Sequence, residues 1–204
     1  FRTGSSCVLI DFGSGQVLPA LAKLGIDKVN ALLHTHHHRD QAQGDAEAIE
    51  AGIPVFVPHY ERHLFDQVEL YWSTKQLYDM VNVRNSYFTL TKSVMVSGLL
   101  VDFDLFVRDG LTCFILPTPG HTPGSISLLV TTDNTTIAFT GDLLHSSGKV
   151  QTLYDMQHAY ASLDGIEAAA MSLDLLRDQS PGILCPSHGE VVYSPDEAIS
   201  STEK

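Results

Sequence analysis

Residues 34–41 concentrate side chains that can bind a metal ion. Their sequence, HTHHHRDQ, holds four histidines and an aspartate directly after an apolar run at 31–33. Neutral imidazole nitrogens bind zinc and other first-row metals, and a carboxylate adds charge and a further ligand oxygen. His36, His38 and Asp40 alternate at the carboxyl end of a predicted strand, where α/β proteins present side chains to ligands. Taken alone, this pattern is also typical of an exposed histidine-rich loop.

Three later segments each place one ligand-type residue at the end of a predicted strand. PTPGHTPGS contains His121, FTGD ends in Asp142, and PSHG contains His188. Glycine or proline flanks each of these residues and favours a tight turn. Four such turns in this order indicate one composite site rather than four unrelated loops.

Together these motifs resemble the successive metal motifs of the metallo-β-lactamase superfamily, nearest to its glyoxalase II-like and lactonase-like hydrolases. The run LIDFG at 9–13 is similar to an early strand-turn element of that superfamily, so the resemblance covers about residues 7–189. It implies an α+β fold, a four-layer αββα sandwich with helices outside two sheets and the metal site along one edge. Members usually begin with further strands, so we expect the first sheet to lack some N-terminal strands.

The resemblance also implies a role for each ligand-type residue. His36, His38 and His121 would form a three-nitrogen metal site. Asp142 would bridge this metal and a second one. Several true β-lactamases carry cysteine at the position of Asp142, which disfavours antibiotic hydrolysis as the main activity.

The second metal site departs from the superfamily pattern at Gln41. In most members a histidine stands there and binds the second metal, together with residues equivalent to Asp40 and His188. An amide oxygen is neutral and a weaker zinc ligand than imidazole. We therefore expect Gln41 to be at most a weak ligand, and the second site to be weakened, lost or filled by a different metal. The expected cofactor is zinc, as one or two ions, with iron as the alternative.

The implied activity is hydrolysis of an ester, thioester or lactone by a metal-bound hydroxide, because zinc lowers the pKa of bound water to about 7. Asp40 and Asp142 are the expected catalytic residues, with Asp40 as general base if one metal binds. One alternative is a non-haem iron oxidoreductase, similar to the sulfur dioxygenases or flavodiiron proteins of the superfamily. Another is a non-catalytic metal-binding module of a larger protein.

The net charge of −12 argues against a nucleic-acid partner, since lysine and arginine form no cluster, and ranks a nuclease activity last. The chain has no apolar run of about 18 residues, so membrane insertion is not expected. Cys7, Cys113 and Cys185 are widely spaced in apolar sequence and suit reduced core residues. We therefore expect a cytoplasmic protein with a small-molecule substrate.

The length of 204 residues suits a single domain over 1–204. The abrupt start at Phe1 and a helix start at 194–199, with a serine cap and proline at the first helical position, suggest an excerpt from a longer chain. Strands are predicted at 8–11, 29–33, 53–57, 94–96, 99–107, 112–116, 125–131, 136–140 and 182–186, and helices at 17–24, 42–51 and 160–177.

The remaining polar and aromatic residues are assigned supporting roles. Asp11 is expected to support the histidine loop through hydrogen bonds, as carboxylates near metal ligands often do. The segment 59–87 is interpreted as a wall or lid over the site. Surface, packing or structural roles are favoured for the other residues, with a substrate contact as the alternative for His145, Tyr154 and Tyr160. These others are His34, His37, His59, His63, His145, Tyr154, His158 and Tyr160, whereas Arg39 is expected to pair with a carboxylate or to border the pocket.

Overall fold

The computed structural model describes residues 1–75, 89–146, 148–150 and 164–203. In this part of the chain, the first of two sheets has the strand order β1-β2-β3-β4-β5. β1 is antiparallel to β2, and each later pair is parallel. The strands are β1 Arg2–Thr3, β2 Ser6–Ile10, β3 Lys28–Leu33, β4 Val55–Pro58 and β5 Gly98–Leu100.

The second sheet has the strand order β10-β9-β8-β7-β6. β10 runs parallel to β9, and the other neighbours are antiparallel. Its strands are β6 Leu105–Arg108, β7 Leu111–Pro117, β8 Ile126–Thr131, β9 Thr136–Gly141 and β10 Ile183–Pro186.

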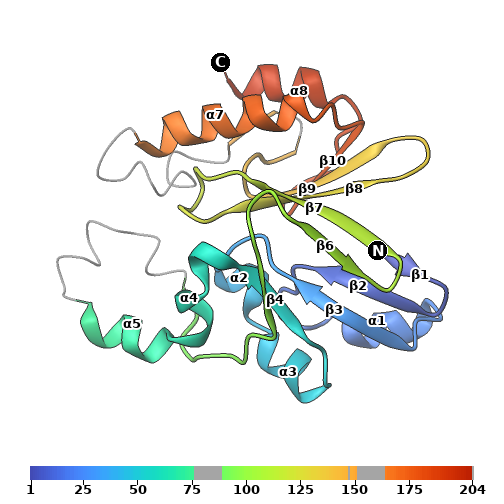
Figure 1. Cartoon of the computed structure of the whole chain (residues 1–204), viewed down its shortest axis with the longest axis vertical. Helices are drawn as coiled ribbons and strands as arrows, with labels where there is room; N and C mark the ends of the chain where they lie inside the picture. The colour runs from blue at the N-terminus through green and yellow to red at the C-terminus, as the bar shows by residue number, and fades with distance from the viewer. Residues whose placement is uncertain (76–88, 147, 151–163, 204) are drawn as a thin grey trace.

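Helices cover the outer faces of both sheets (Figure 1). α7 and α8 lie over the second sheet, and the earlier helices lie against the first. This arrangement confirms the predicted four-layer αββα fold. The helices are α1 Leu18–Lys23, α2 Arg39–Ala42, α3 Asp45–Glu50, the 3-10 turn η1 His59–Glu61, α4 His63–Asp66, α5 Val68–Thr74, α7 Asp164–Asp178 and α8 Pro195–Thr202.

Side chains of β3 alternate between the two faces of the first sheet and therefore contribute to two layers of the core. Leu33 packs between the sheets with Ile115 and Leu128, whereas Leu32 packs with Phe65 on the helix side. Successive side chains of a strand point to opposite faces, and a strand buried on both faces is apolar throughout. Full burial of one such leucine contributes about 1.5–3 kcal/mol. β3 is therefore held firmly, and the histidine segment follows it directly.

Several predicted elements differ from the observed ones. In place of the helix predicted at 42–51, α2 ends at Ala42 and α3 covers Asp45–Glu50, with Gly44 before α3, where an added Cβ would lie 2.5 Å from the backbone nitrogen of Gly15. The strand predicted at 99–107 is interrupted between β5 and β6, because Phe103 adopts a positive φ of 63° and its N–H donates to the carbonyl of Ile115. Residues 94–96 form no strand.

The two C-terminal helices also refine the prediction. α7 is described from Asp164, so the first residues of the helix predicted at 160–177 lie outside the described part. α8 begins at Pro195 after Ser194, as predicted, but the Ser194 side chain makes no capping hydrogen bond. Within the described residues, no helix has both the length and the apolar character needed to cross a membrane.

Candidate metal centre

The ligand-type residues come together because their strands all end at one edge of the two sheets. His36 and His38 follow β3, His121 follows β7, and Asp142 directly follows β9. His188 follows β10, which lies beside β9 in parallel orientation. Residues separated by up to 152 positions in the chain thus share one site, since position 36 and position 188 both contribute to it.

The first group consists of His36, His38, His121 and Asp142. His38 Nδ1 lies 3.2 Å from His36 Nε2 and 2.9 Å from His121 Nε2. Asp142 Oδ2 lies 3.2 Å from His121 Nε2 and 3.7 Å from His36 Nε2. The three imidazole rings are buried. One ligand atom from each of the four residues lies within 4.8 Å of all the others.

The chemistry and spacing of the first group fit a tetrahedral metal ion. Two imidazole nitrogens bound to one zinc at about 2.0–2.1 Å lie roughly 3.3 Å apart, near the distances from His38 to its two neighbours. Burial and the adjacent rings of His38 and His121 hold the pKa of His36 well below its usual range. His36 is therefore neutral, which is the form that binds metal. Asp142 Oδ1 is buried without a hydrogen-bond partner among the described residues, and a cation would satisfy this carboxylate.

The second group consists of Asp40, Asp142 and His188. His188 Nε2 lies 2.9 Å from Asp40 Oδ2 and 3.7 Å from Asp142 Oδ2. The same Asp142 oxygen therefore takes part in both groups, as expected of a bridging carboxylate. Burial raises the pKa of Asp40, but the hydrogen bond and charge of His188 outweigh this effect and lower it below its ordinary value. Asp40 is consequently a carboxylate at neutral pH.

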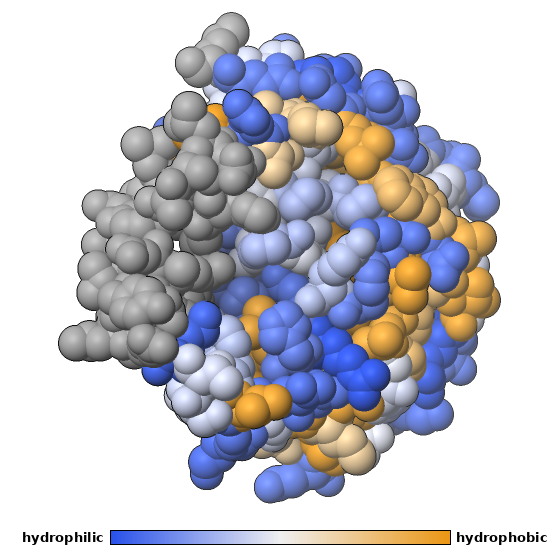
Figure 2. Space-filling view, turned by 60° about the vertical axis from the view of Figure 1, so that its left-hand side comes forward, coloured by the Kyte–Doolittle hydropathy of each residue, from blue (hydrophilic) through white to orange (hydrophobic). Residues whose placement is uncertain are grey.

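The second group connects the buried ligands to solvent. Asp40 and His188 are about half exposed, whereas the histidines of the first group are buried. Figure 2 brings forward the left-hand side of Figure 1 and shows hydrophilic side chains around the hollowed centre of this face. Hydrophobic side chains gather toward its right-hand edge.

Gln41 lies beside the second group, in a cavity of about 420 Å³ that Asp40 and His188 also line. Its side chain is 2% exposed, and Oε1 has no hydrogen-bond partner in the described part of the chain. Its backbone carbonyl accepts hydrogen bonds from the N–H groups of Phe12 and Gly13. The backbone of Gln41 is thus held in place at the position predicted to weaken the second metal site.

Carboxylates hold the start of the histidine segment in place. Asp11 accepts hydrogen bonds from the backbone N–H and hydroxyl of Thr35, at 2.9 and 2.8 Å, in the supporting role predicted for it. The His34 ring lies between Asp11 and Asp45, with Nδ1 3.3 Å from Asp11 and Nε2 3.0 Å from Asp45. Burial lowers the pKa of His34, but both carboxylates outweigh it and raise the pKa to about 10. His34 is therefore a structural cation.

The sequence pattern singles out neither Asp45 nor Glu61, although both carboxylates are buried beside the histidine segment. Asp45 contacts His34, and Glu61 contacts His37. Acidic residues near the start of a helix normally face solvent, where their charge interacts favourably with the helix dipole. Only the tertiary contacts distinguish these two acids from exposed ones.

Other predicted residues have simpler surroundings. Arg39 Nε donates to the carbonyl of Thr89 at 2.7 Å, and no carboxylate of the described residues pairs with it. The His145 ring stacks on the His188 ring with centroids 6.2 Å apart. His59 Nδ1 lies 3.7 Å from an Asp102 carboxylate oxygen. Tyr154, His158, Tyr160 and residues 76–88 of the predicted wall lie outside the described residues.

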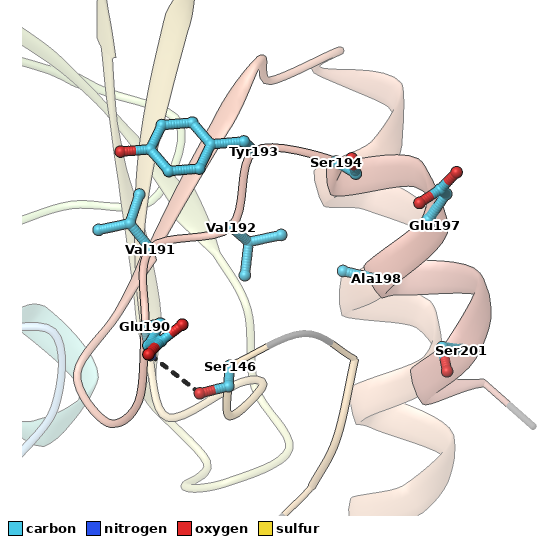
Figure 3. Close-up of a pocket in the computed structure, with 9 residues that line it drawn as sticks. All are labelled: Ser146, Glu190, Val191, Val192, Tyr193, Ser194, Glu197, Ala198 and Ser201. Atoms are coloured by element: carbon cyan, nitrogen blue, oxygen red, sulfur yellow. Dashed lines mark hydrogen bonds between the residues drawn. The ribbon is translucent and has the colours of Figure 1, made fainter.

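A further cavity of about 420 Å³ lies between the segment after His188 and α8 (Figure 3). The Glu190 N–H donates to Ser146 Oγ at 2.9 Å, and Val192 points toward the helix. None of its lining residues belongs to either metal group. They are Ser146, Glu190, Val191, Val192, Tyr193, Ser194, Glu197, Ala198 and Ser201.

An αββα fold with a cluster of histidine and aspartate side chains at its strand ends is typical of a class of metal-binding proteins. The family model of the metallo-beta-lactamase superfamily matches residues 1–188, and the chain belongs to this superfamily.

Solved structures of the same fold and one curated protein are similar to this chain. The crystal structure of the BLEG-1 B3 metallo-beta-lactamase is 21% identical, with a TM-score of 0.71 over 98% of this chain and 87% of that one. A Cronobacter sakazakii metallo-beta-lactamase with a HARLDQ motif is 20% identical, with a TM-score of 0.64 over 88% of this chain and 68% of that one. Uncharacterized protein YobT of Bacillus subtilis (strain 168) is 37% identical over 88 residues, 41% of this chain and 37% of that protein. The matched part thus spans little more than a third of this curated relative.

Proposed function

We propose that the protein is a metal-dependent hydrolase that cleaves an ester, thioester or lactone bond in a small-molecule substrate. The observation that carries this proposal is the convergence of three buried imidazole nitrogens and one carboxylate oxygen in the first group. Its Asp142 oxygen is shared with a more exposed aspartate and histidine pair. A buried metal position beside an exposed acid suits attack by water on an electrophilic carbon.

The chain's own residues supply orientation and proton transfer in this proposal. Zinc in such a site supplies hydroxide at neutral pH and polarises the carbonyl oxygen of the substrate. His36, His38, His121 and Asp142 would hold it. Asp40, ionised and held by His188 at 2.9 Å, would orient the attacking water and accept its proton.

Gln41 leads us to propose one firmly held metal rather than two. A buried amide offers one neutral oxygen where an imidazole nitrogen would be a stronger zinc ligand. The motif name of the Cronobacter sakazakii neighbour also ends in Asp-Gln, as Asp40 and Gln41 do. At 20% identity that likeness supports the fold alone.

Elemental analysis of the protein purified without added metal, alongside Gln41→His, tests the metal content. We expect one zinc per chain, rising to two in Gln41→His. Two zinc ions in the unaltered protein would contradict the weakened second site. Iron would favour an oxidoreductase of the same superfamily, and no metal after reconstitution would favour a non-catalytic module.

Hydrolysis assays on a lactone, a thioester, a carboxylic ester and a β-lactam then test the activity. The β-lactam is included because the solved neighbours are named as metallo-beta-lactamases. We expect turnover of at least one of the first three substrates, and its loss in Asp40→Asn with metal content retained. Asn keeps the shape of Asp40 but cannot accept the proton. Full activity of Asp40→Asn would exclude Asp40 as the base.

A further inference from the structure

Glu61 is a buried carboxylate that contacts both loops carrying the histidines of the first group. It ends the short turn η1 after β4 and is 2% exposed. Oε2 accepts the backbone N–H of His37 at 2.7 Å and lies 2.9 Å from His37 Nδ1. Oε1 accepts the hydroxyl of Thr122 at 2.5 Å and the N–H of Gly124 at 3.1 Å.

Each carboxylate oxygen thus serves a different ligand loop. His37 stands between two ligands, so its bonds to Oε2 fix the backbone from which both of their side chains project. Thr122 directly follows His121, so its bond to Oε1 fixes the other loop. A buried charge is stable only when it is fully hydrogen-bonded, and these four contacts fulfil that requirement.

The packing around Glu61 is as specific as its hydrogen bonds. A Cβ on Gly124 would lie 2.4 Å from Glu61 Cγ and 3.0 Å from Tyr60 Cβ, so only glycine allows this close approach. Burial raises the pKa of Glu61, but the interactions with His37, Thr122 and Gly124 outweigh it and lower the pKa below its ordinary value. The side chain is therefore an ionised acceptor, locked between the loops.

We infer that Glu61 is the positioning residue of the first group, which holds the two ligand loops at the separation that a single metal ion requires. This inference rests on the proposed function, because it concerns the same metal position. Glu61 acts through its hydrogen bonds to His37 and Thr122, which are the direct chain neighbours of His36, His38 and His121. Its removal should lower metal affinity even where the protein remains folded.

Glu61→Gln tests the inference with almost no change in volume. A glutamine has one acceptor oxygen, so it can satisfy either His37 or the Thr122 loop, while its NH₂ group faces an N–H or hydroxyl donor at the other. We expect zinc affinity, measured by competition with a chromophoric chelator, to fall about 10- to 100-fold, the range typical of residues that orient metal ligands.

Glu69→Gln is the matched control. Glu69 also joins two segments, since it accepts hydrogen bonds from the backbone N–H and hydroxyl of Ser93, but it is exposed and belongs to α5. The zinc affinity of the Glu69→Gln variant should equal that of the unaltered protein. Chemical unfolding of the metal-free proteins gives the second readout, because a purely structural role would lower stability and leave the zinc affinity of the folded protein unchanged.

Thr122→Val provides a second variant, in which the carboxylate keeps its other three contacts. We expect a smaller loss of affinity, and a combined loss in Glu61→Gln/Thr122→Val below the sum of the two, since both act through one contact. If zinc affinity is unchanged in Glu61→Gln, the inference is overturned while the proposed function stands. If Glu61→Gln does not fold, unchanged zinc affinity in Thr122→Val has the same meaning. An unaltered protein that binds no first-row metal overturns the proposed function and this inference together.

Discussion

His34 Nε2 lies 3.0 Å from Asp45 Oδ1, and both side chains are completely buried. Asp45→Ala would leave the protonated imidazole with Asp11 as its remaining acid partner. Removing one partner of a buried ion pair costs about 3–5 kcal/mol, so we predict a loss of this size in the free energy of unfolding, measured in urea.

Asp174→Ala is the control for this prediction, because Asp174 forms an exposed pair with Arg177 at 2.6 Å. Exposed pairs contribute about 1 kcal/mol or less. Equal losses in the two variants would show that His34 and Asp45 do not form a stabilising charged pair.

The same pair predicts how stability depends on pH. The pKa of His34 is raised to about 10 in the folded protein, by Asp45 and Asp11, against an ordinary value of 6.5. A raised pKa stabilises the fold fully below the ordinary value, and this contribution is lost as the pH rises through the folded value. The stability difference between the unaltered protein and Asp45→Ala should therefore be largest below pH 6.5 and shrink toward pH 10. A difference that grows with pH would refute the assignment of His34 as a cation.

Gly120 is predicted to be irreplaceable because it combines a positive φ with close packing. Its φ is 145°, and an added Cβ would lie 2.7–2.9 Å from Ala169 in α7, backbone nitrogen included. Gly52→Ala isolates the conformational part, since Gly52 has a φ of 74° with nothing within 4 Å. We expect Gly120→Ala to cost roughly 1–3 kcal/mol more than Gly52→Ala in urea unfolding. Since His121 follows Gly120, zinc affinity should fall in Gly120→Ala alone.

Removal of a ligand of the first group should abolish metal-dependent stabilisation. A metal ion that binds only the folded state stabilises it by RT ln(1 + [L]/Kd), where [L] is the concentration of free metal. At a hundredfold excess over Kd this stabilisation is about 2.7 kcal/mol. We predict that zinc raises the melting temperature of the unaltered protein and of His59→Ala, but not of His121→Ala. His59 is a suitable control because it pairs with Asp102 and not with the first group. An equal zinc-induced shift in His121→Ala would remove His121 from the ligand set.

The three cysteines are predicted to differ in reactivity. Cys7 and Cys113 are buried, and burial raises the pKa of Cys113 to about 12. Cys185 is partly exposed, although burial also raises the pKa of its thiol. A thiol reagent at pH 8 should modify Cys185 alone in the folded protein and all three after unfolding. Rapid modification of Cys113 in the folded protein would contradict its burial.

The candidate ligand residues, whose clustering the structure shows, could be singled out from the sequence because each follows a local pattern. An apolar strand followed by one histidine or aspartate at the strand end recurs at His36, His121, Asp142 and His188, and glycine or proline flanks the last three. The parallel β2, β3 and β4 required no information beyond alternating strands and helices. These features depend on neighbours a few residues away, which the sequence displays directly.

Only the tertiary structure showed that Asp45 and Glu61, in addition to Asp11, support the histidine segment, and where elements break. Glu61 reaches His37 across 24 positions and Thr122 across 61, and no local pattern encodes a contact of that kind. α3 begins only after Gly44, although the apolar periodicity of the predicted helix starts at Ala42, and the backbone of Gly15 packs against Gly44. Asp45 and Glu61 are buried and hydrogen-bonded to the histidine segment, since a carboxylate removed from water must find its partners within the protein.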